Sequence, residues 1–153
     1  MMLPFKRILC PVDFSDFSYQ ALDKAGELAA HFRAQLCVLH VAPPVETAYD
    51  LDPYLGPIPS HVADYQEAVT EGARQKLGEV IEHKHFGIEV LPLLREGNAA
   101  DEIVNTIGME NSDLIVIATH GLSGWRHLVF GSVAEKVIRL APCPVLVTHA
   151  QKS

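Results

Sequence analysis

The chain has 153 residues, of which 48% are hydrophobic and 20% charged, a composition typical of one soluble globular domain. Twelve basic residues against nineteen acidic ones give a net charge of −7, which argues against nucleic-acid binding because that needs a basic face. No apolar run approaches the length of a membrane span, so we expect no membrane crossing. The three cysteines form no C-x-x-C pair and lie in or beside apolar runs, which predicts buried free thiols in a reducing cytoplasm.

Short apolar runs alternate with amphipathic stretches from the start of the chain. The run 7–12 has the length of a strand, and residues 15–32 place their apolar side chains on one helical face. Ser15 or Asp16 can cap this helix, because either side chain can accept a hydrogen bond from a free N–H of the first turn. The run 35–41 predicts the second strand.

The middle of the chain is predicted to contain a long loop, a helix and a strand. Residues 42–60 contain five prolines and no periodicity, and loops of this length are often binding or lid segments. Apolar residues that step at three and four predict a helix over 60–83. A third strand is predicted over 88–94, and Pro92 within it favours an edge position because proline has no N–H to donate.

The last third of the chain continues the alternation. Asn98 is predicted to cap a short helix over 99–109. The run 113–119 is the most apolar throughout, as expected for a central parallel strand covered on both faces. A further helix is predicted to start at Ser132, and the run 144–149 is predicted to be the last strand.

This order of elements predicts an α/β fold with a single five-stranded, parallel, doubly wound sheet and helices on both faces, similar to a Rossmann fold. No internal repeat, low-complexity tract or linker is present, so residues 1–153 are predicted to form one domain. In such sheets, ligands bind beyond the carboxyl ends of the strands, near the point where the strand order reverses.

Three stretches are predicted to meet at those strand ends. Gly131 and Ser132 open a helix, whose unpaired N–H groups attract an anion, and glycine permits close approach to the backbone. Asp13 can accept hydrogen bonds from an adenine amino group or a ribose hydroxyl, and Val41 offers an apolar wall for a base. In the alternative interpretation, Asp13 only caps a helix and the glycines only form turns. His40 is interpreted as a core histidine with satisfied hydrogen bonds.

The sequence resembles the universal stress protein family over nearly its whole length. The resemblance is carried by PVDFS around Asp13, by REGNAADEI and by a glycine pattern. ATP-binding members of the family carry a glycine, two residues, a glycine, nine residues and then a glycine followed by Ser or Thr. Gly121, Gly131 and Ser132 match this pattern, whereas Ala118 replaces its first glycine. Alanine tolerates ordinary strand dihedrals but would be strained at a positive φ.

The resemblance implies a homodimer and a site for ATP, with or without Mg²⁺. Carried over by position, the implied binding residues are Pro11, Val12, Asp13, Val41, Ile117, Ala118, Thr119, His120, Gly121, Gly131, Ser132 and Val133. No catalytic or metal-ligating residue is predicted. The run 144–149 contains no Lys, Asp or Glu, residues that would discourage pairing at a sheet edge. We therefore expect it to pair with the same strand of a second copy across a two-fold axis.

The functional hypothesis is a stress-response regulator that binds ATP without catalysis. The alternatives are a slow ATP hydrolase that uses the same site and a dimerisation module that binds no nucleotide. Hydrolysis usually needs a Lys or Arg and a metal held by a carboxylate, and Asp13 is the one obvious carboxylate at the predicted strand ends. A flavin carrier is disfavoured, because the first strand is followed by PVDFSDFS and not by a phosphate loop rich in Thr, Ser and Gly.

Overall fold

The computed structural model of the chain describes residues 3–45, 60–119 and 130–149. These residues form a five-stranded parallel sheet with the strand order β3-β2-β1-β4-β5. The strands are β1 Arg7–Pro11, β2 Gln35–Ala42, β3 Val90–Glu96, β4 Leu114–Ala118 and β5 Val145–Thr148. The helices of the described residues are α1 Asp16–Phe32, α3 Ser60–Lys84, α4 Ala99–Glu110 and α5 Ser132–Leu140. The predicted α/β fold is confirmed.

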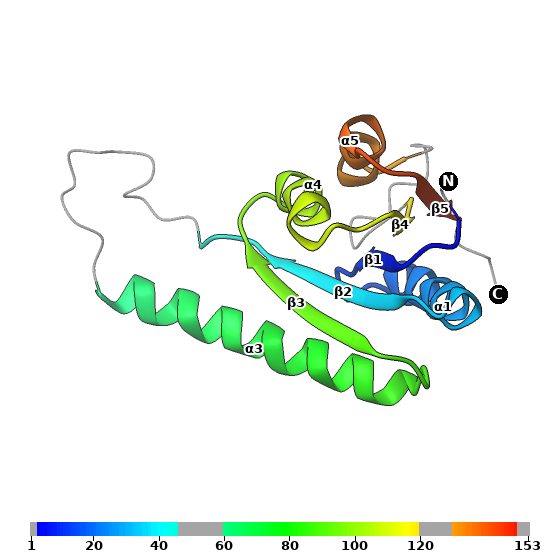
Figure 1. Cartoon of the computed structure of the whole chain (residues 1–153). Helices are drawn as coiled ribbons and strands as arrows, with labels where there is room; N and C mark the ends of the chain where they lie inside the picture. Colours follow the sequence, from blue (N-terminus) through cyan, green and yellow to red (C-terminus); the bar gives the residue numbers. More distant parts are fainter. Residues whose placement is uncertain (1–2, 46–59, 120–129, 150–153) are drawn as a thin grey trace.

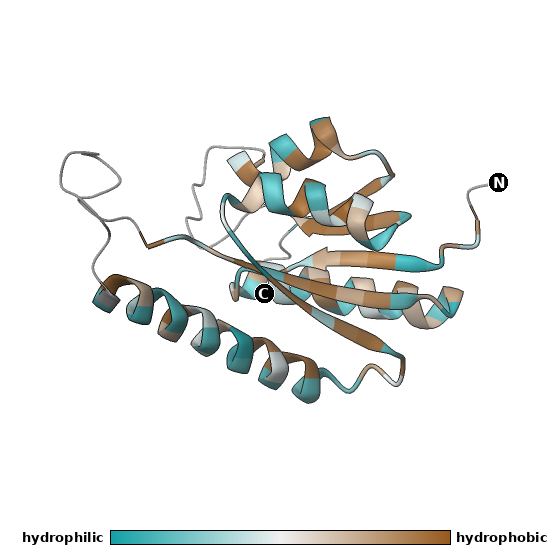
Figure 2. Cartoon of the chain, turned by 60° about the vertical axis from the view of Figure 1, so that its left-hand side comes forward, coloured by the Kyte–Doolittle hydropathy of each residue, from teal (hydrophilic) through white to brown (hydrophobic). Residues whose placement is uncertain are grey.

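Helices cover both faces of the sheet (Figure 1). Because successive side chains of a strand point to opposite faces, neighbouring residues of β1 enter different cores. Ile8 packs in one core with Leu22 of α1 and Leu77 of α3, whereas Leu9 packs in the other with Ile107 of α4. Figure 2 shows the strands mainly in the hydrophobic colour and both hydrophobic and hydrophilic residues along each helix. The cover on both faces that was predicted for the run 113–119 is confirmed, because residues 114–117 of β4 are all buried.

Two helix caps show how polar side chains fix the helix starts. Ser15, and not Asp16, is the N-cap of α1, and its side chain accepts a hydrogen bond from the N–H of Ser18 at 3.2 Å. Asn98 is the N-cap of α4 and accepts from the N–H of Asp101 at 3.2 Å, as predicted. Each cap satisfies an N–H group that has no partner within its own helix.

The edge strand β3 lies two residues later than the predicted 88–94. The strand includes the charged residues Arg95 and Glu96, because β2 extends far enough to pair with both of them. The N–H of Leu36 donates to the carbonyl of Glu89 at 3.2 Å, so the odd-numbered residues of β3 direct their backbone groups toward β2. Pro92 therefore turns its nitrogen to the free edge, where no N–H is needed, and its predicted edge position is confirmed.

The cysteines are free, as predicted, although not all of them are fully buried. Cys10 and Cys37 are buried within β1 and β2, whereas Cys143, which precedes β5, is half-buried. Burial raises the pKa of all three thiols, and that of Cys37 to about 11. In the described ranges, no helix combines the length and the apolar character that a membrane crossing requires.

Candidate functional site

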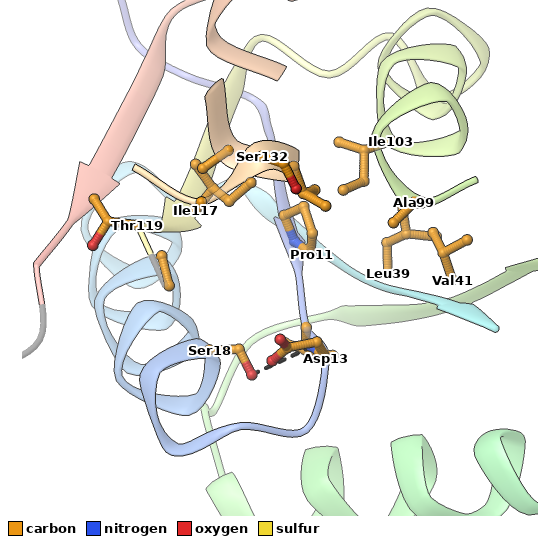
Figure 3. Close-up of a pocket in the computed structure, with 15 residues that line it drawn as sticks. Pro11, Asp13, Ser18, Leu39, Val41, Ala99, Ile103, Ile117, Thr119 and Ser132 are labelled. Atoms are coloured by element: carbon orange, nitrogen blue, oxygen red, sulfur yellow. Dashed lines mark hydrogen bonds between the residues drawn. The ribbon is translucent and has the colours of Figure 1, made fainter. Parts of the chain in front are cut away.

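A pocket of about 330 Å³ opens at the carboxyl ends of β1, β2 and β4 (Figure 3). Here β1 pairs with β2 on one side and with β4 on the other, so the strand order reverses between β1 and β4. Ligands of doubly wound sheets bind at this kind of switch point. The pocket is lined by Pro11, Val12, Asp13, Ser18, Leu39, Val41, Ala99, Ile103, Ile117, Ala118, Thr119, Gly131, Ser132, Val133 and Ala134.

Every predicted binding residue within the described ranges lines this pocket. His120 and Gly121 lie outside the described residues. Residues from three distant parts of the chain thus meet around one cavity, because parallel strands bring their carboxyl ends to the same edge of the sheet. Most of the lining side chains are apolar, and polar groups come from Asp13, Ser18, Thr119 and Ser132.

Sequence reasoning missed five lining residues: Ser18, Leu39, Ala99, Ile103 and Ala134. Leu39 precedes Val41 by two positions on β2, so strand periodicity places both on one face, and this signal was available. Ala99 and Ile103 lie one turn apart on α4, and only the packing of α4 over β2 brings them to the cavity. Their stretch, REGNAADEI, contributed to the family resemblance without an assigned role.

The carboxylate of Asp13 is held in a turn between β1 and α1. Its Oδ1 accepts hydrogen bonds from the N–H of Ser15 at 3.0 Å and from the hydroxyl of Ser15. The first of these bonds is an Asx-turn. The N–H of Asp13 donates to the hydroxyl of Ser18 at 3.4 Å, drawn as the dashed line in Figure 3. Asp13 is therefore not the helix cap, which is Ser15, but it lines the pocket while bonded to that cap.

The start of α5 forms another wall of the pocket. Gly131 is its N-cap, and the N–H of Gly131 donates to the carbonyl of Thr119 at 2.7 Å. The first hydrogen bond within the helix runs from the N–H of Glu135 to the carbonyl of Gly131, at 3.0 Å. The three N–H groups between them, from residues 132–134, have no partner within the helix and are the ones available to an anion.

The backbone explains why residue 131 is a glycine and why residue 118 can be an alanine. A Cβ at Gly131 would lie 3.1 Å from the carbonyl oxygen of Thr119, so glycine permits the close approach of the two backbones. The φ of Gly131 is −69°, so the glycine is not needed for a left-handed conformation. Ala118 ends β4 opposite Thr148 and is not among the residues with positive φ. The alanine that replaces the first glycine of the family pattern therefore fits this backbone without strain.

The arrangement combines a shaped apolar cavity with a few directed polar groups, which is typical of small-molecule sites. In Figure 3, Asp13 and Ser18 lie well apart from Ser132, with Pro11 between them in the view. A hydrogen-bond acceptor and the N-terminus of α5 are thus separated by apolar surface. The described residues contain no group of three or more His, Cys, Asp or Glu able to hold a metal ion.

A model of the universal stress protein family matches residues 4–149. The chain belongs to this family. It is 33% identical over 150 residues to the universal stress protein MJ0531 of Methanocaldococcus jannaschii, an alignment that covers 97% of this chain and 84% of that protein. The predicted family membership is confirmed.

Solved structures show the same fold in the family. The universal stress protein MJ0577 of Methanocaldococcus jannaschii superposes with a TM-score of 0.80 at 25% identity, over 97% of this chain and 99% of that one. Another universal stress protein, solved in complex with cAMP, superposes with a TM-score of 0.65 at 24% identity, over 95% of this chain and 97% of that one.

Proposed function

We propose that this protein is a stress-response regulator that binds an adenine nucleotide, ATP in the first instance, without efficient turnover. The observation that carries the proposal is the pocket itself. A carboxylate and the free amides of a helix start lie at separate positions around one apolar cavity at the switch point of the sheet. A nucleotide has the matching parts: a flat base, hydroxyl and amino donors, and an anionic phosphate tail.

Each part of the nucleotide has a proposed position. Val41 and Leu39 supply apolar surface for the base, and the carboxylate of Asp13 accepts from an amino or hydroxyl group. The amides of residues 132–134 and the hydroxyl of Ser132 donate to phosphate oxygens. Any Mg²⁺ would be held through the phosphates, because the described residues offer no acidic cluster for it.

Family membership supports the proposal at the level of the fold. A universal stress protein of the same fold was solved in complex with cAMP, so this architecture accommodates an adenine nucleotide. The roles of the individual residues rest on the geometry of the pocket and on the family pattern that Gly131 and Ser132 complete.

The test begins with the ligand. Mass spectrometry of the small molecules released when the purified protein is denatured should detect an adenine nucleotide. Calorimetric titration of the ligand-free protein with ATP, with and without Mg²⁺, should give saturable binding. If neither experiment detects a nucleotide, the protein is better described as a dimerisation module that binds none.

Variants then test the assignment of Asp13. Asp13→Ala should weaken ATP binding by about 1–3 kcal/mol, the scale of a lost hydrogen bond that involves a charged group. Asp16→Ala is the matched control, because Asp16 is an exposed carboxylate in the first turn of α1 and does not line the pocket. Unchanged affinity in Asp13→Ala would reduce Asp13 to its role in the Asx-turn.

A further inference from the structure

One side chain of β2 contacts both chain neighbours of Asp13. The Nδ1 atom of His40 lies 2.8 Å from the carbonyl oxygen of Val12, the residue before Asp13. The imidazole ring of His40 stacks on the ring of Phe14, the residue after Asp13, with centroids 4.2 Å apart and planes at 26°. The short stretch that carries Asp13 is thus held from both sides by a residue distant in the sequence.

The contact with Val12 also determines that Nδ1 of the imidazole carries a hydrogen. A carbonyl oxygen only accepts hydrogen bonds, so the hydrogen must lie on Nδ1 of His40. The N–H of Val12 meanwhile donates to the carbonyl of Leu39 at 2.8 Å. Both backbone polar groups of Val12 are therefore hydrogen-bonded to Leu39 and His40 of β2. These two bonds fix the orientation of the backbone immediately before Asp13.

The contact with Phe14 holds an unfavourable backbone conformation. The φ of Phe14 is +64°, in the left-handed region, where a residue other than glycine pays about 1–2 kcal/mol. The ring is held by the stack on His40 and by the ammonium of Lys76 on α3, which lies 4.7 Å from the ring centroid. This turn brings Ser15 to the position where its N–H and hydroxyl bond the carboxylate of Asp13.

We propose that His40 is a positioning residue that sets the orientation of Asp13 in the pocket through the carbonyl of Val12 and the ring of Phe14. His40 itself is absent from the pocket lining, so it acts through Asp13 and not on the ligand. The consequence for ligand affinity rests on the proposed function, whereas the consequence for the turn does not.

Two substitutions separate the two contacts. His40→Phe keeps a ring that can stack on Phe14 and removes the donor to Val12. His40→Asn keeps a donor near the position of Nδ1 and removes the ring. His83 provides the control, because its Nδ1 lies 2.7 Å from the carbonyl of Glu79 within α3, a similar bond away from the pocket. His83→Phe removes that bond.

The binding experiment is a double-mutant cycle with ATP as the probe. His40→Phe should weaken ATP binding about tenfold in the wild-type background and have no further effect in an Asp13→Ala background, because the two residues act as one unit. His83→Phe should leave the affinity unchanged. An equal loss from His40→Phe in both backgrounds would show that His40 acts independently of Asp13 and would overturn the proposal.

A second experiment needs no ligand. Amide hydrogen exchange at Ser15 reports the bond from its N–H to Asp13. Both His40 variants should accelerate exchange at Ser15 by at least about fivefold while exchange within α3 stays at the wild-type rate. Unchanged exchange at Ser15 in both variants would refute the positioning role. If wild-type protein binds no ATP, the proposed function fails, and this exchange measurement still decides the role of His40.

Discussion

The N–H of Gly131 donates to the carbonyl oxygen of Thr119 at 2.7 Å, and this bond joins the start of α5 to the end of β4. The helix amides proposed to hold phosphate are therefore placed by a backbone contact that leaves little room for a side chain. A Cβ at Gly131 would lie 3.1 Å from the oxygen of Thr119.

Gly131→Ala should weaken ATP binding by about tenfold, and Gly131→Val by more, because the added carbon displaces the helix start from the phosphate. The fold should persist, since the φ of −69° is allowed for both residues. Calorimetry gives the affinity, and circular dichroism checks the fold. The matched control is Gly78→Ala in α3, where a Cβ would meet nothing within 4 Å. That control should bind ATP as the wild type does; a folded Gly131→Val variant with wild-type affinity would contradict the assignment.

The protein should release phosphate from ATP no faster than about once per minute, far below ordinary enzyme rates of about 1–10³ per second. Efficient phosphoryl transfer needs a charged group placed on the transferring phosphate, and the described pocket lining contains one carboxylate and no Lys or Arg. A phosphate-release assay with ATP and Mg²⁺ measures the rate. Turnover above about one per second would replace the regulator with an ATPase.

The chain should form a homodimer through β5. The carbonyl of Pro144 accepts a hydrogen bond from Ile115 of β4 at 3.0 Å, and that of Thr148 accepts one at 3.1 Å from Thr119, the residue after β4. The backbone groups of Val145 and Val147 therefore point to the free edge of the sheet. Leu146 is 42% exposed beside them. Pairing with a second copy would satisfy these groups and cover this side chain.

Val147→Pro should weaken that dimer, because it removes an outward N–H without breaking a bond to β4. Val147→Ala is the control that shortens the side chain and keeps the N–H. Light scattering at micromolar concentration should give a dimer mass for the wild type and for Val147→Ala, and a larger monomer fraction for Val147→Pro. A monomer mass for the wild type would end the proposal.

His40 should make the protein less stable in mild acid. Burial lowers the pKa of His40 below its ordinary value of 6.5 and Lys76 lowers it further, which outweighs the opposing effects of the bond to Val12 and of Asp13. The unfolded chain therefore takes up this proton at a higher pH than the folded one does. The stability contribution is complete above about pH 7 and is lost as the pH falls through the lowered pKa.

Denaturant unfolding at a series of pH values between about 7.5 and 5 measures this effect. The free energy of unfolding should fall with pH more steeply in the wild type than in His40→Phe, which has no titrating ring at this position. Identical slopes in the wild type and in His40→Phe would show that His40 titrates alike in both states.

The sequence by itself determined the fold class, the cap at Asn98 and most of the residues that line the pocket. The alternation of apolar runs and amphipathic stretches is a local signal, and parallel strands necessarily bring their carboxyl ends together. Asp13, Val41 and Gly131 could therefore be predicted to meet although they lie far apart in the chain. Pro92 likewise favoured an edge strand, because a proline in the middle of a strand has no N–H to donate to a second neighbour.

Only the tertiary structure decided which groups contact one another across distant parts of the chain. The N–H of Gly131 donates to the carbonyl of Thr119, and α4 brings Ala99 to the cavity. His40 contacts both chain neighbours of Asp13. Each of these is a contact between segments that are separated in the sequence. No periodicity encodes such contacts, since they depend on the strand order and on how each helix packs over the sheet. Side-chain pattern tells which face a residue occupies, whereas the partner that meets it there is fixed only when the whole chain has folded.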